Sequence, residues 1–352
     1  MCIILPANGT NRALHPLDDS ITAVWEINFV KAIARAQYGP PEVLRFTEME
    51  KPVPKDNEVL INVCAASVNP VDLYCMRGAP LLRRVSTPKQ KILGCDIAGR
   101  VEAVGKNVRK FQQGDEVFGV TGFGGGGFAE FVCAIEDKLA LKPTNVSFEN
   151  AAVVPIAAIT ALQGIRDKGQ IQRGQEVLID GASGGVGTFA IQIAKSFGAE
   201  VTAVCSARNL ETAGSIGADH VIDYAREDFT KNGTRYDLIF AANAHHAVFD
   251  YRRALKPGGI CVVAGGALTQ VLQAMLLGPL LSRFGSKMIR CFLANINHKD
   301  LVCLKELLET GKVVPVIDRR YPLSDTAEAL RYLEEHHARG KVVLIVEHRS
   351  QA

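Results

Sequence analysis

A stretch of small residues between two apolar runs constrains this chain more than any other part of its sequence. The apolar run at residues 176–180 is followed by small residues and then by a helical pattern at residues 188–197. Ala182, Gly184 and Gly187 have the spacing of a dinucleotide-binding fingerprint, with alanine in the place of its first glycine. A second strand-like run follows the helix, so the stretch has the strand–turn–helix–strand context that this fingerprint requires.

This turn is expected to bind a pyrophosphate. Small residues let the backbone approach the phosphate oxygens, and the helix N-terminus offers unpaired N–H groups and a partial positive charge. A tight strand–helix turn without a ligand would need one glycine rather than three. We therefore assign six residues to the cofactor site: Ala182, Ser183, Gly184, Gly185, Val186 and Gly187.

The pattern of the chain changes near residue 150. Residues 31–150 contain short alternating runs separated by proline and glycine, which predict a β-barrel domain. In residues 151–290, six strand-like runs alternate with helical patterns, which predicts a doubly wound parallel sheet of the Rossmann type and hence an α/β fold. Residues 291–352 are expected to return to the first domain. Residues 1–30 lack the features of a signal or transit peptide and are expected to form a loose extension.

The composition argues against several classes of function. The formal net charge is +3 over 352 residues and the basic residues are scattered, so we expect no nucleic-acid surface. No apolar run reaches the length of a membrane span, and residues 268–281 are expected to form a buried or pocket-covering helix. The nine cysteines form no CxxC pair, which favours reduced core cysteines in a cytosolic protein.

Several segments together resemble a known family. They read KAIARAQYGPPEVL, AASVNPVDLYCMRG, LGCDIAGRVEAVG, GDEVFG, GASGGVGTFAIQIAK, IGADHVIDY, LKPGG and ARGKVVL. From residue 31 to residue 347 the chain resembles the zinc-independent medium-chain dehydrogenase/reductases, in the quinone oxidoreductase branch that includes enone and alkenal reductases. The resemblance implies a GroES-like catalytic barrel, a Rossmann domain and a nicotinamide between them. It also implies that residues 1–30 are dispensable, and it favours a homodimer.

The same resemblance shows that zinc ligands are missing. Zinc-dependent relatives carry Cys, His and Cys where this chain has Asn69, Cys95 and Ile156. A catalytic zinc needs three protein ligands, and neither asparagine nor isoleucine supplies a thiolate or an imidazole. We therefore expect no metal. Without a Lewis acid to bind an alkoxide, reduction of a quinone or of a conjugated C=C bond is favoured over alcohol oxidation.

The resemblance also suggests roles for individual polar residues. Asn69 matches an asparagine near the nicotinamide and is assigned to catalysis and cofactor binding; alternatively, it caps the turn before Pro70. Thr160 matches a threonine that faces the carboxamide; alternatively, it bonds its own helix backbone. Tyr74 matches a tyrosine of several quinone reductases and is assigned as a proton or hydrogen-bond donor; alternatively, it only lines the cleft. Asn243 is also assigned to the cofactor site.

The end of the second Rossmann strand predicts which cofactor is bound. In NAD-binding domains an acid about 20 residues past the glycine loop bonds the ribose 2′-hydroxyl. Here the strand ends at Cys205, and no acid occurs before Glu211. Ser206 offers a hydrogen bond and Arg208 a guanidinium for a 2′-phosphate, and Tyr224 resembles a family residue that closes this pocket. The alternative is that Arg208 is a solvated surface cation.

These observations predict an NADPH-dependent cytoplasmic oxidoreductase. Hydride would pass to a quinone or to the β-carbon of an α,β-unsaturated carbonyl, and the proton would come from Tyr74 or water. The substrate pocket is expected to use residues 79–86 and 268–284. Two alternatives stay open, which are an NADP-linked alcohol dehydrogenase and a cofactor-binding interaction protein without significant turnover.

Overall fold

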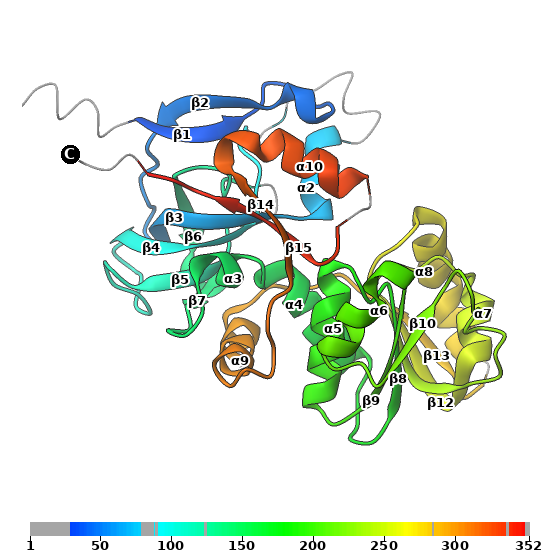
Figure 1. Ribbon diagram of the computed structural model, residues 1–352. Coiled ribbons are helices and arrows are strands. Elements are labelled where there is room, and N and C mark those ends of the chain that lie inside the picture. The colour runs from blue at the N-terminus through cyan, green and yellow to red at the C-terminus, as the bar shows by residue number, and fades with distance from the viewer. Residues whose placement is uncertain are drawn as a thin grey trace, which may run out of the picture.

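The computed structural model describes residues 29–78, 88, 91–122, 125–283, 285–335 and 338–348. Within them the chain forms two large sheets and a two-stranded ribbon (Figure 1). The ribbon pairs β1 (Phe29–Ala34) with β2 (Arg45–Glu50) in antiparallel register. The predicted extension lies outside the described residues, except that its last two residues, Phe29 and Val30, begin β1 and pair with β2.

The first domain is built on a seven-stranded sheet. Its strand order is β14-β15-β3-β4-β5-β7, and β6 pairs with β3. The strands are β3 (Glu58–Val68), β4 (Asp96–Val104), β5 (Glu116–Val120), β6 (Phe131–Ile135), β7 (Leu139–Leu141), β14 (Ile317–Pro322) and β15 (Lys341–Ile345). The helices α2 (Pro70–Arg77), α3 (Phe148–Ala152) and α10 (Thr326–Glu334) lie beside this sheet (Figure 1). The last strand, β15, is antiparallel to β3, so the tail of the chain returns to this sheet.

The second large sheet has six parallel strands in the order β10-β9-β8-β11-β12-β13, which is a doubly wound Rossmann arrangement. The strands are β8 (Glu176–Asp180), β9 (Glu200–Cys205), β10 (His220–Asp223), β11 (Tyr236–Ala241), β12 (Leu255–Val263) and β13 (Met288–Cys291). The helices α5 (Gly185–Ser196), α6 (Leu210–Ser215), α7 (Val248–Ala254) and α8 (Leu268–Arg283) belong to this half. The helices α4 (Pro155–Leu162) and α9 (His298–Glu309) pack on each other and contact strands of the barrel sheet. A π-helical turn, η4 (Gln163–Lys168), continues α4. The predicted α/β fold class is confirmed.

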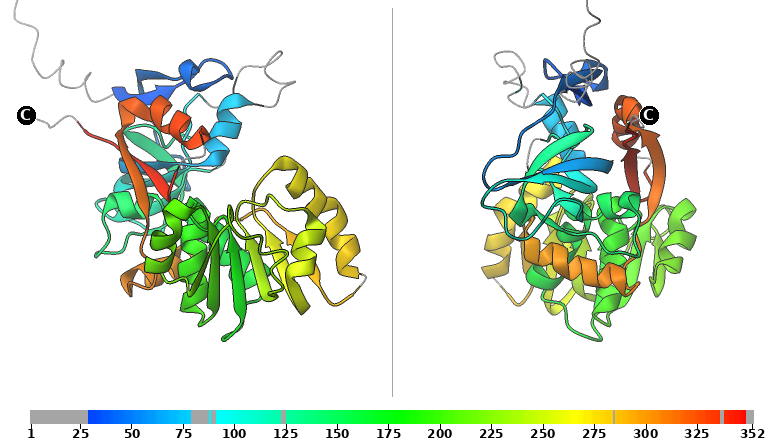
Figure 2. Two further views of the ribbon diagram at one scale, coloured as in Figure 1. Left: turned by 45° about the vertical axis from the view of Figure 1, so that its right-hand side comes forward. Right: turned by 90° about the vertical axis from the view of Figure 1, so that its left-hand side faces the viewer.

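Both faces of the parallel sheet are covered by helices (Figure 2). Successive strand side chains point to opposite faces. Val177 and Ile179 of β8 therefore join the core that contains α4, α5 and α9, whereas Leu178 joins the core under α7 and α8. Burial on both faces explains why the strands of this half are almost continuously apolar.

Helix α8 differs from its expectation. The apolar run forms a helix as predicted, but only Ala274 and Gly278 are buried on it, while Leu268 and Leu276 are among its exposed residues. The physical reason is that α8 approaches β13 closely at its small residues Ala274 and Gly278. A Cβ on Gly278 would lie 3.1 Å from the Ile289 carbonyl oxygen, so only a glycine fits there without a shift. Val271, Leu277 and Leu281 are partly buried against the core, and the other large apolar side chains are exposed, namely Leu268, Leu272, Met275, Leu276 and Leu280.

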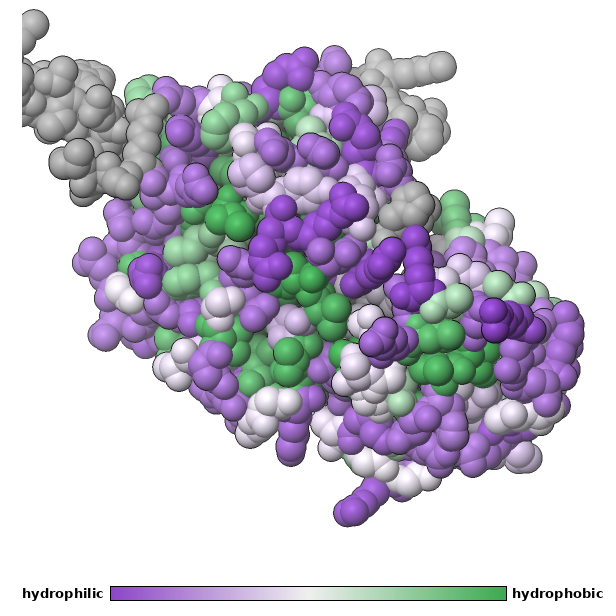
Figure 3. All heavy atoms as spheres, in the orientation of Figure 1, coloured by the Kyte–Doolittle hydropathy of each residue, from purple (hydrophilic) through white to green (hydrophobic). Residues whose placement is uncertain are grey.

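The surface of the described residues fits the modest net charge. Hydrophilic side chains are spread over the face shown in Figure 3 and are not gathered in one block. Among the described residues, no helix combines the length and the hydropathy that crossing a bilayer requires. The eight cysteines in this part of the chain are all free thiols, and Cys95, Cys205 and Cys261 are buried.

A buried tyrosine–carboxylate contact gives a test of how the Rossmann half is held together. The Tyr251 hydroxyl of α7 donates to Asp180 Oδ2 at the end of β8 over 2.5 Å, and both residues are buried. Tyr251→Phe leaves this carboxyl without its hydroxyl donor, so we expect a loss of about 1.5–3 kcal/mol in the free energy of unfolding, measured by urea denaturation. Tyr332→Phe is the control, since its hydroxyl meets the more exposed Asp318; an equal loss there would contradict the prediction.

Candidate active site

The glycine loop joins β8 to α5 and leaves the start of that helix uncapped. Gly181, with φ +80°, turns the chain out of β8, and α5 begins at Gly185, three residues before the predicted helical pattern. Its N-cap, Gly184, has no side chain to accept from the first N–H groups, and the first turn carries no acid. Unpaired N–H groups and the positive end of the helix dipole therefore face this loop, which suits a phosphate.

The glycines of this loop meet different neighbours. A Cβ on Gly187 would lie 2.2 Å from the Gly181 carbonyl oxygen, so Gly187 allows close packing of helix on strand. A Cβ on Gly185 would lie 2.6 Å from Lys341 Cδ, so Gly185 makes room for a lysine side chain of the barrel sheet. Around Gly184 the nearest atom would be 3.6 Å away. Of these three, Gly184 is the glycine that leaves the loop open to a ligand.

The structure brings the predicted 2′-phosphate residues to the carboxyl end of β9. The Tyr224 backbone N–H donates to the Cys205 carbonyl oxygen over 3.2 Å, and this contact sets Tyr224 beside the strand end. Ser206 Oγ accepts from Asn209 Nδ2 over 2.9 Å, so the Ser206 hydroxyl hydrogen stays available to a ligand. Arg208 is exposed. Asn209 Oδ1 is buried and has no hydrogen-bond partner.

Sequence reasoning missed a second cation at this end of the sheet. Arg339 lines a small pocket together with Ser183, Asn209 and Thr212. It lies between α10 and β15, more than 150 residues after Ser183, so no local spacing relates the two. The only feature of the sequence that pointed to Arg339 was its place in the ARGKVVL segment, which is one of the segments that carry the family resemblance.

On the barrel side, a buried polar network surrounds Asn69. Asp96 is fully buried and accepts hydrogen bonds from Ser67 Oγ, Asn69 Nδ2 and the Ile156 backbone N–H, over 3.0, 2.9 and 3.0 Å. Lys341 Nζ donates to Asn69 Oδ1 over 2.5 Å. The Asn69 amide is thus held by side chains from β4 and β15. Asn69 is also the N-cap residue of α2, where its backbone N–H donates to Asp72 Oδ2 over 2.8 Å.

Burial makes charge expensive in this network. Desolvation raises the pKa of Asp72 to about 7 and also raises the pKa of Asp96. Desolvation lowers the pKa of Lys341, while the two neighbouring carboxyls oppose that change. The ammonium of Lys341 lies 3.7 Å from Asp96 Oδ2, so each charge is the other's partner inside the protein.

A pocket of about 180 Å³ lies between the two halves of the chain. Its lining includes Val71, Cys95 and Ile156 on one side and Phe292, Leu293 and Ile296 of the segment after β13 on the other. The walls are therefore mainly apolar, and they adjoin the carboxyl end of the Rossmann sheet, where ligands of such folds bind. Thr160 also lines the pocket, although its hydroxyl donates to the Ile156 carbonyl of its own helix over 2.7 Å.

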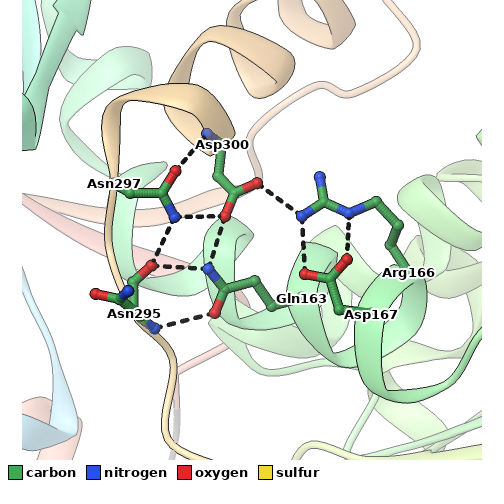
Figure 4. A network of polar contacts seen from close by, with 6 residues as sticks. All are labelled: Gln163, Arg166, Asp167, Asn295, Asn297 and Asp300. Carbon is green, nitrogen blue, oxygen red and sulfur yellow. Dashed lines mark hydrogen bonds and ion pairs between the residues drawn. The ribbon is translucent and has the colours of Figure 1, made fainter.

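The segment after β13 is held in place by a polar network (Figure 4). Gln163 Nε2 donates to the Asn295 carbonyl oxygen and to Asp300 Oδ2, each over 2.7 Å, and Gln163 Oε1 accepts from the Asn295 N–H. Asn297 and Arg166 also donate to the Asp300 carboxylate. The π-helical turn that carries Gln163 and Arg166 thereby fixes the backbone that forms one wall of the pocket.

Some predicted residues lie apart from the pocket. Tyr74 on α2 is 74% exposed and does not line it. Asn243 is exposed beside Gly181, with its backbone N–H on the Asp180 carbonyl oxygen. No residue of α8 lines the pocket, whose Rossmann wall comes instead from Ala264 and the segment after β13. The other predicted pocket segment, residues 79–86, lies outside the described residues.

The residues at the zinc positions do not suit that metal. Asn69, Cys95 and Ile156 do adjoin one another around Asp96, but the Asn69 oxygen faces the ammonium of Lys341 and Ile156 is apolar. In the part of the chain that the structure describes, no group of three His, Cys, Asp or Glu side chains is placed to hold a metal ion. We derive no zinc chemistry from this donor set.

Comparison with known proteins identifies the family. Residues 55–144 match the alcohol dehydrogenase GroES-like domain, and residues 216–344 match the zinc-binding dehydrogenase domain. The chain is 36% identical to a 2-methylene-furan-3-one reductase of Solanum lycopersicum, covering 97% of this chain and 85% of that protein. The chain belongs to the medium-chain dehydrogenase/reductase family, in its quinone oxidoreductase branch.

Two further members of this family are informative. The medium-chain reductase is 35% identical to an NADPH-dependent alkenal/one oxidoreductase of Arabidopsis thaliana, over 90% of this chain and 79% of that protein. Its fold matches the Escherichia coli quinone oxidoreductase that was crystallised with NADPH, with a TM-score of 0.77 and 26% identity. That match covers 90% of this chain and 99% of the other.

We expect substitutions at two glycines of the loop to have different effects, one on the stability of this reductase and the other on its binding of NADPH. Gly187→Ala forces a methyl group against backbone, so we expect it to lower the free energy of unfolding by about 1–3 kcal/mol. A Cβ at position 184 would contact only the Gly181 carbonyl oxygen, at an ordinary 3.6 Å, and its φ of −77° suits alanine, so we expect an unchanged melting temperature. The methyl group of Gly184→Ala would stand where a phosphate has to approach the loop, so we expect weaker NADPH binding. Thermal unfolding and NADPH titration of both variants measure this, and a Gly184→Ala protein that binds NADPH normally would refute the reading of Gly184.

Proposed function

We propose that this protein is an NADPH-dependent reductase that transfers hydride to a quinone or to the β-carbon of an α,β-unsaturated carbonyl, without zinc. The observation that carries the proposal is the mainly apolar pocket between the two halves, which Cys95 and Ile156 line at two of the three zinc positions. Ile156 has no donor atom in its side chain, and the oxygen of Asn69 at the third position accepts from Lys341, so the three positions do not form a zinc ligand set. A conjugated acceptor spreads the developing negative charge, so it needs no Lewis acid. The printed names of the relatives, an alkenal/one oxidoreductase and a furanone reductase, support this substrate class.

The cofactor fits the loop through its phosphates. The uncrowded position of Gly184 and the uncapped N-terminus of α5 suit a pyrophosphate held by the backbone N–H groups of residues 185–187. When bound, NADPH supplies the hydride, and the protein contributes its binding, its orientation and a cleft that excludes water. Ala182, Ser183, Val186, Thr160 and Asn243 are proposed to complete the cofactor site.

Tyr74 stays our proposed proton or hydrogen-bond donor to the substrate oxygen. Its exposed position on α2 means that the ring has to turn toward a bound substrate. We expect Tyr74→Phe to lower kcat for an enone by about tenfold or more while the NADPH dissociation constant stays unchanged, since the hydroxyl acts on the reacting substrate. Stopped-flow reduction and NADPH titration measure the two effects. Unchanged turnover would leave water as the donor.

An NADPH-consumption screen tests the function directly. The panel contains quinones, 2-alkenals, cyclic enones and acrylates, with saturated carbonyls as matched controls that lack the C=C bond. We expect turnover of at least one conjugated acceptor and none of its saturated counterpart. Oxidation of primary alcohols with NADP⁺ would favour the alcohol dehydrogenase alternative. Tight NADPH binding without turnover of any acceptor would favour the interaction protein.

We also propose a cytoplasmic homodimer. The cytoplasmic location rests on the cysteines, of which the eight in the described residues are free thiols, although relatives named in the comparison include chloroplastic and mitochondrial proteins. Light scattering on the purified chain tests the dimer, and a mass of about 38 kDa, that of one chain, would contradict it. Fractionation of cells that express the full chain tests the location.

Arg208 gives the test of cofactor choice. Removing a charge-assisted contact costs about 1.5–3 kcal/mol, so we expect Arg208→Ala to weaken NADPH binding by about 10- to 150-fold and to leave NADH binding nearly unchanged. Arg226→Ala is the control, because Arg226 is an exposed cation of the same region paired with Asp223. If Arg339→Ala produces the NADPH-selective loss instead, the 2′-phosphate partner is Arg339 and the assignment of Arg208 is wrong.

A further inference from the structure

Lys341 is a buried lysine that touches both halves of the chain. It is the first residue of β15 and is 4% exposed. Its stem lies against the glycine loop, because a Cβ on Gly185 would come within 2.6 Å of its Cδ. Its ammonium reaches the barrel side, 2.5 Å from Asn69 Oδ1 and 3.7 Å from Asp96 Oδ2. One side chain therefore spans from the proposed phosphate loop to Asn69.

The contacts of Asn69 show what the lysine controls. Both Asn69 amide hydrogens have acceptors, since Nδ2 lies 2.9 Å from Asp96 Oδ2 and 3.4 Å from the Ser67 carbonyl oxygen. The amide oxygen accepts from Lys341. An amide can be turned over without changing its shape, and here the cation on one side and the carboxyl on the other fix which end is oxygen. Without Lys341, the Asn69 oxygen loses the group that orients it.

Packing alone does not explain why a lysine stands at position 341. A buried ammonium is costly unless it is paired and hydrogen-bonded, and an apolar side chain of the same length would fill the space without that cost. The chain instead keeps a cation here, supplies Asp96 as its partner and uses glycine at position 185 to admit its stem. A second buried barrel lysine, Lys142, pairs with Glu116 and backbone carbonyls and contacts neither Asn69 nor the loop.

We propose that Lys341 is a positioning residue for the nicotinamide half of the cofactor. Its ammonium orients the Asn69 amide, and its stem sets the distance between that amide and the glycine loop. The proposal rests on the proposed function, because it requires that NADPH binds at this loop and that Asn69, as the family resemblance implies, lies near the nicotinamide. It places no demand on the adenosine half, whose proposed contacts at Ser206, Arg208 and Tyr224 lie at the end of β9.

Binding of whole and half cofactors tests the proposal. The probes are NADPH and adenosine 2′,5′-bisphosphate, which lacks the nicotinamide half, both titrated calorimetrically against the full chain. We expect Lys341→Met to raise the NADPH dissociation constant by about tenfold or more, as for loss of a charge-assisted contact, and to change that of the bisphosphate by less than about twofold. The fluorescence anisotropy of bound NADPH should also fall, because the nicotinamide is held less firmly. Lys142→Met is the matched control and should change neither dissociation constant.

A second variant guards against misfolding. Lys341→Met leaves Asp96 without its cation, so the double variant Asp96→Asn/Lys341→Met removes both charges together and should fold where the single variant does not. The same selective loss of NADPH affinity is expected from it. Equal weakening of both probes, or unchanged NADPH binding and anisotropy, would overturn the proposal. A wild-type protein that binds neither probe would instead refute the proposed function.

Discussion

The pairing of the last strand with the third is the contact on which most of the candidate site depends. β15 runs antiparallel to β3 with Val342 opposite Val68. This register brings Lys341 and Asn69 together, although 272 positions separate them in the sequence. The turn that leads into β15 carries Arg339 to the fingerprint loop. The chain crosses from the barrel to the Rossmann sheet and back, and the returning strand supplies side chains to the contact between the two.

The glycine-rich loop shows how similar residues can meet different physical demands. A phosphate-binding turn has to let a ligand approach, let the helix pack on the strand and fit its neighbours from the other domain. Gly184 meets the first demand, Gly187 the second and Gly185 the third. The third demand arises from Lys341, whose stem occupies the space that a side chain at position 185 would need. The loop and the barrel network are therefore coupled through steric contact as well as through charge.

Much of the fold could be predicted because its signals are local. The run of apolar strands, the small residues after β8 and the end of the second strand at Cys205 all lie within short stretches, and they predicted the parallel sheet, the strand–loop–helix turn and the end of β9. The assignment of the 2′-phosphate residues stays a prediction. The exposure of α8 could not be predicted, because an apolar run does not reveal that Ala274 and Gly278 would be its only buried residues. For the same reason the pocket wall was assigned to the wrong segment. Phe292 and Leu293 line it because Gln163 and Asp300 hold that backbone in place.

The sequence by itself determined the fold class and the fingerprint loop, because each follows from which residues stand at a few neighbouring positions. Only the tertiary structure decided that the Asn69 amide faces Lys341, that Asp96 shares this cation and that Arg339 stands beside Ser183. Those contacts join segments far apart in the chain. Their geometry depends on strand register and on the packing of one domain against the other, and no spacing along the sequence encodes either.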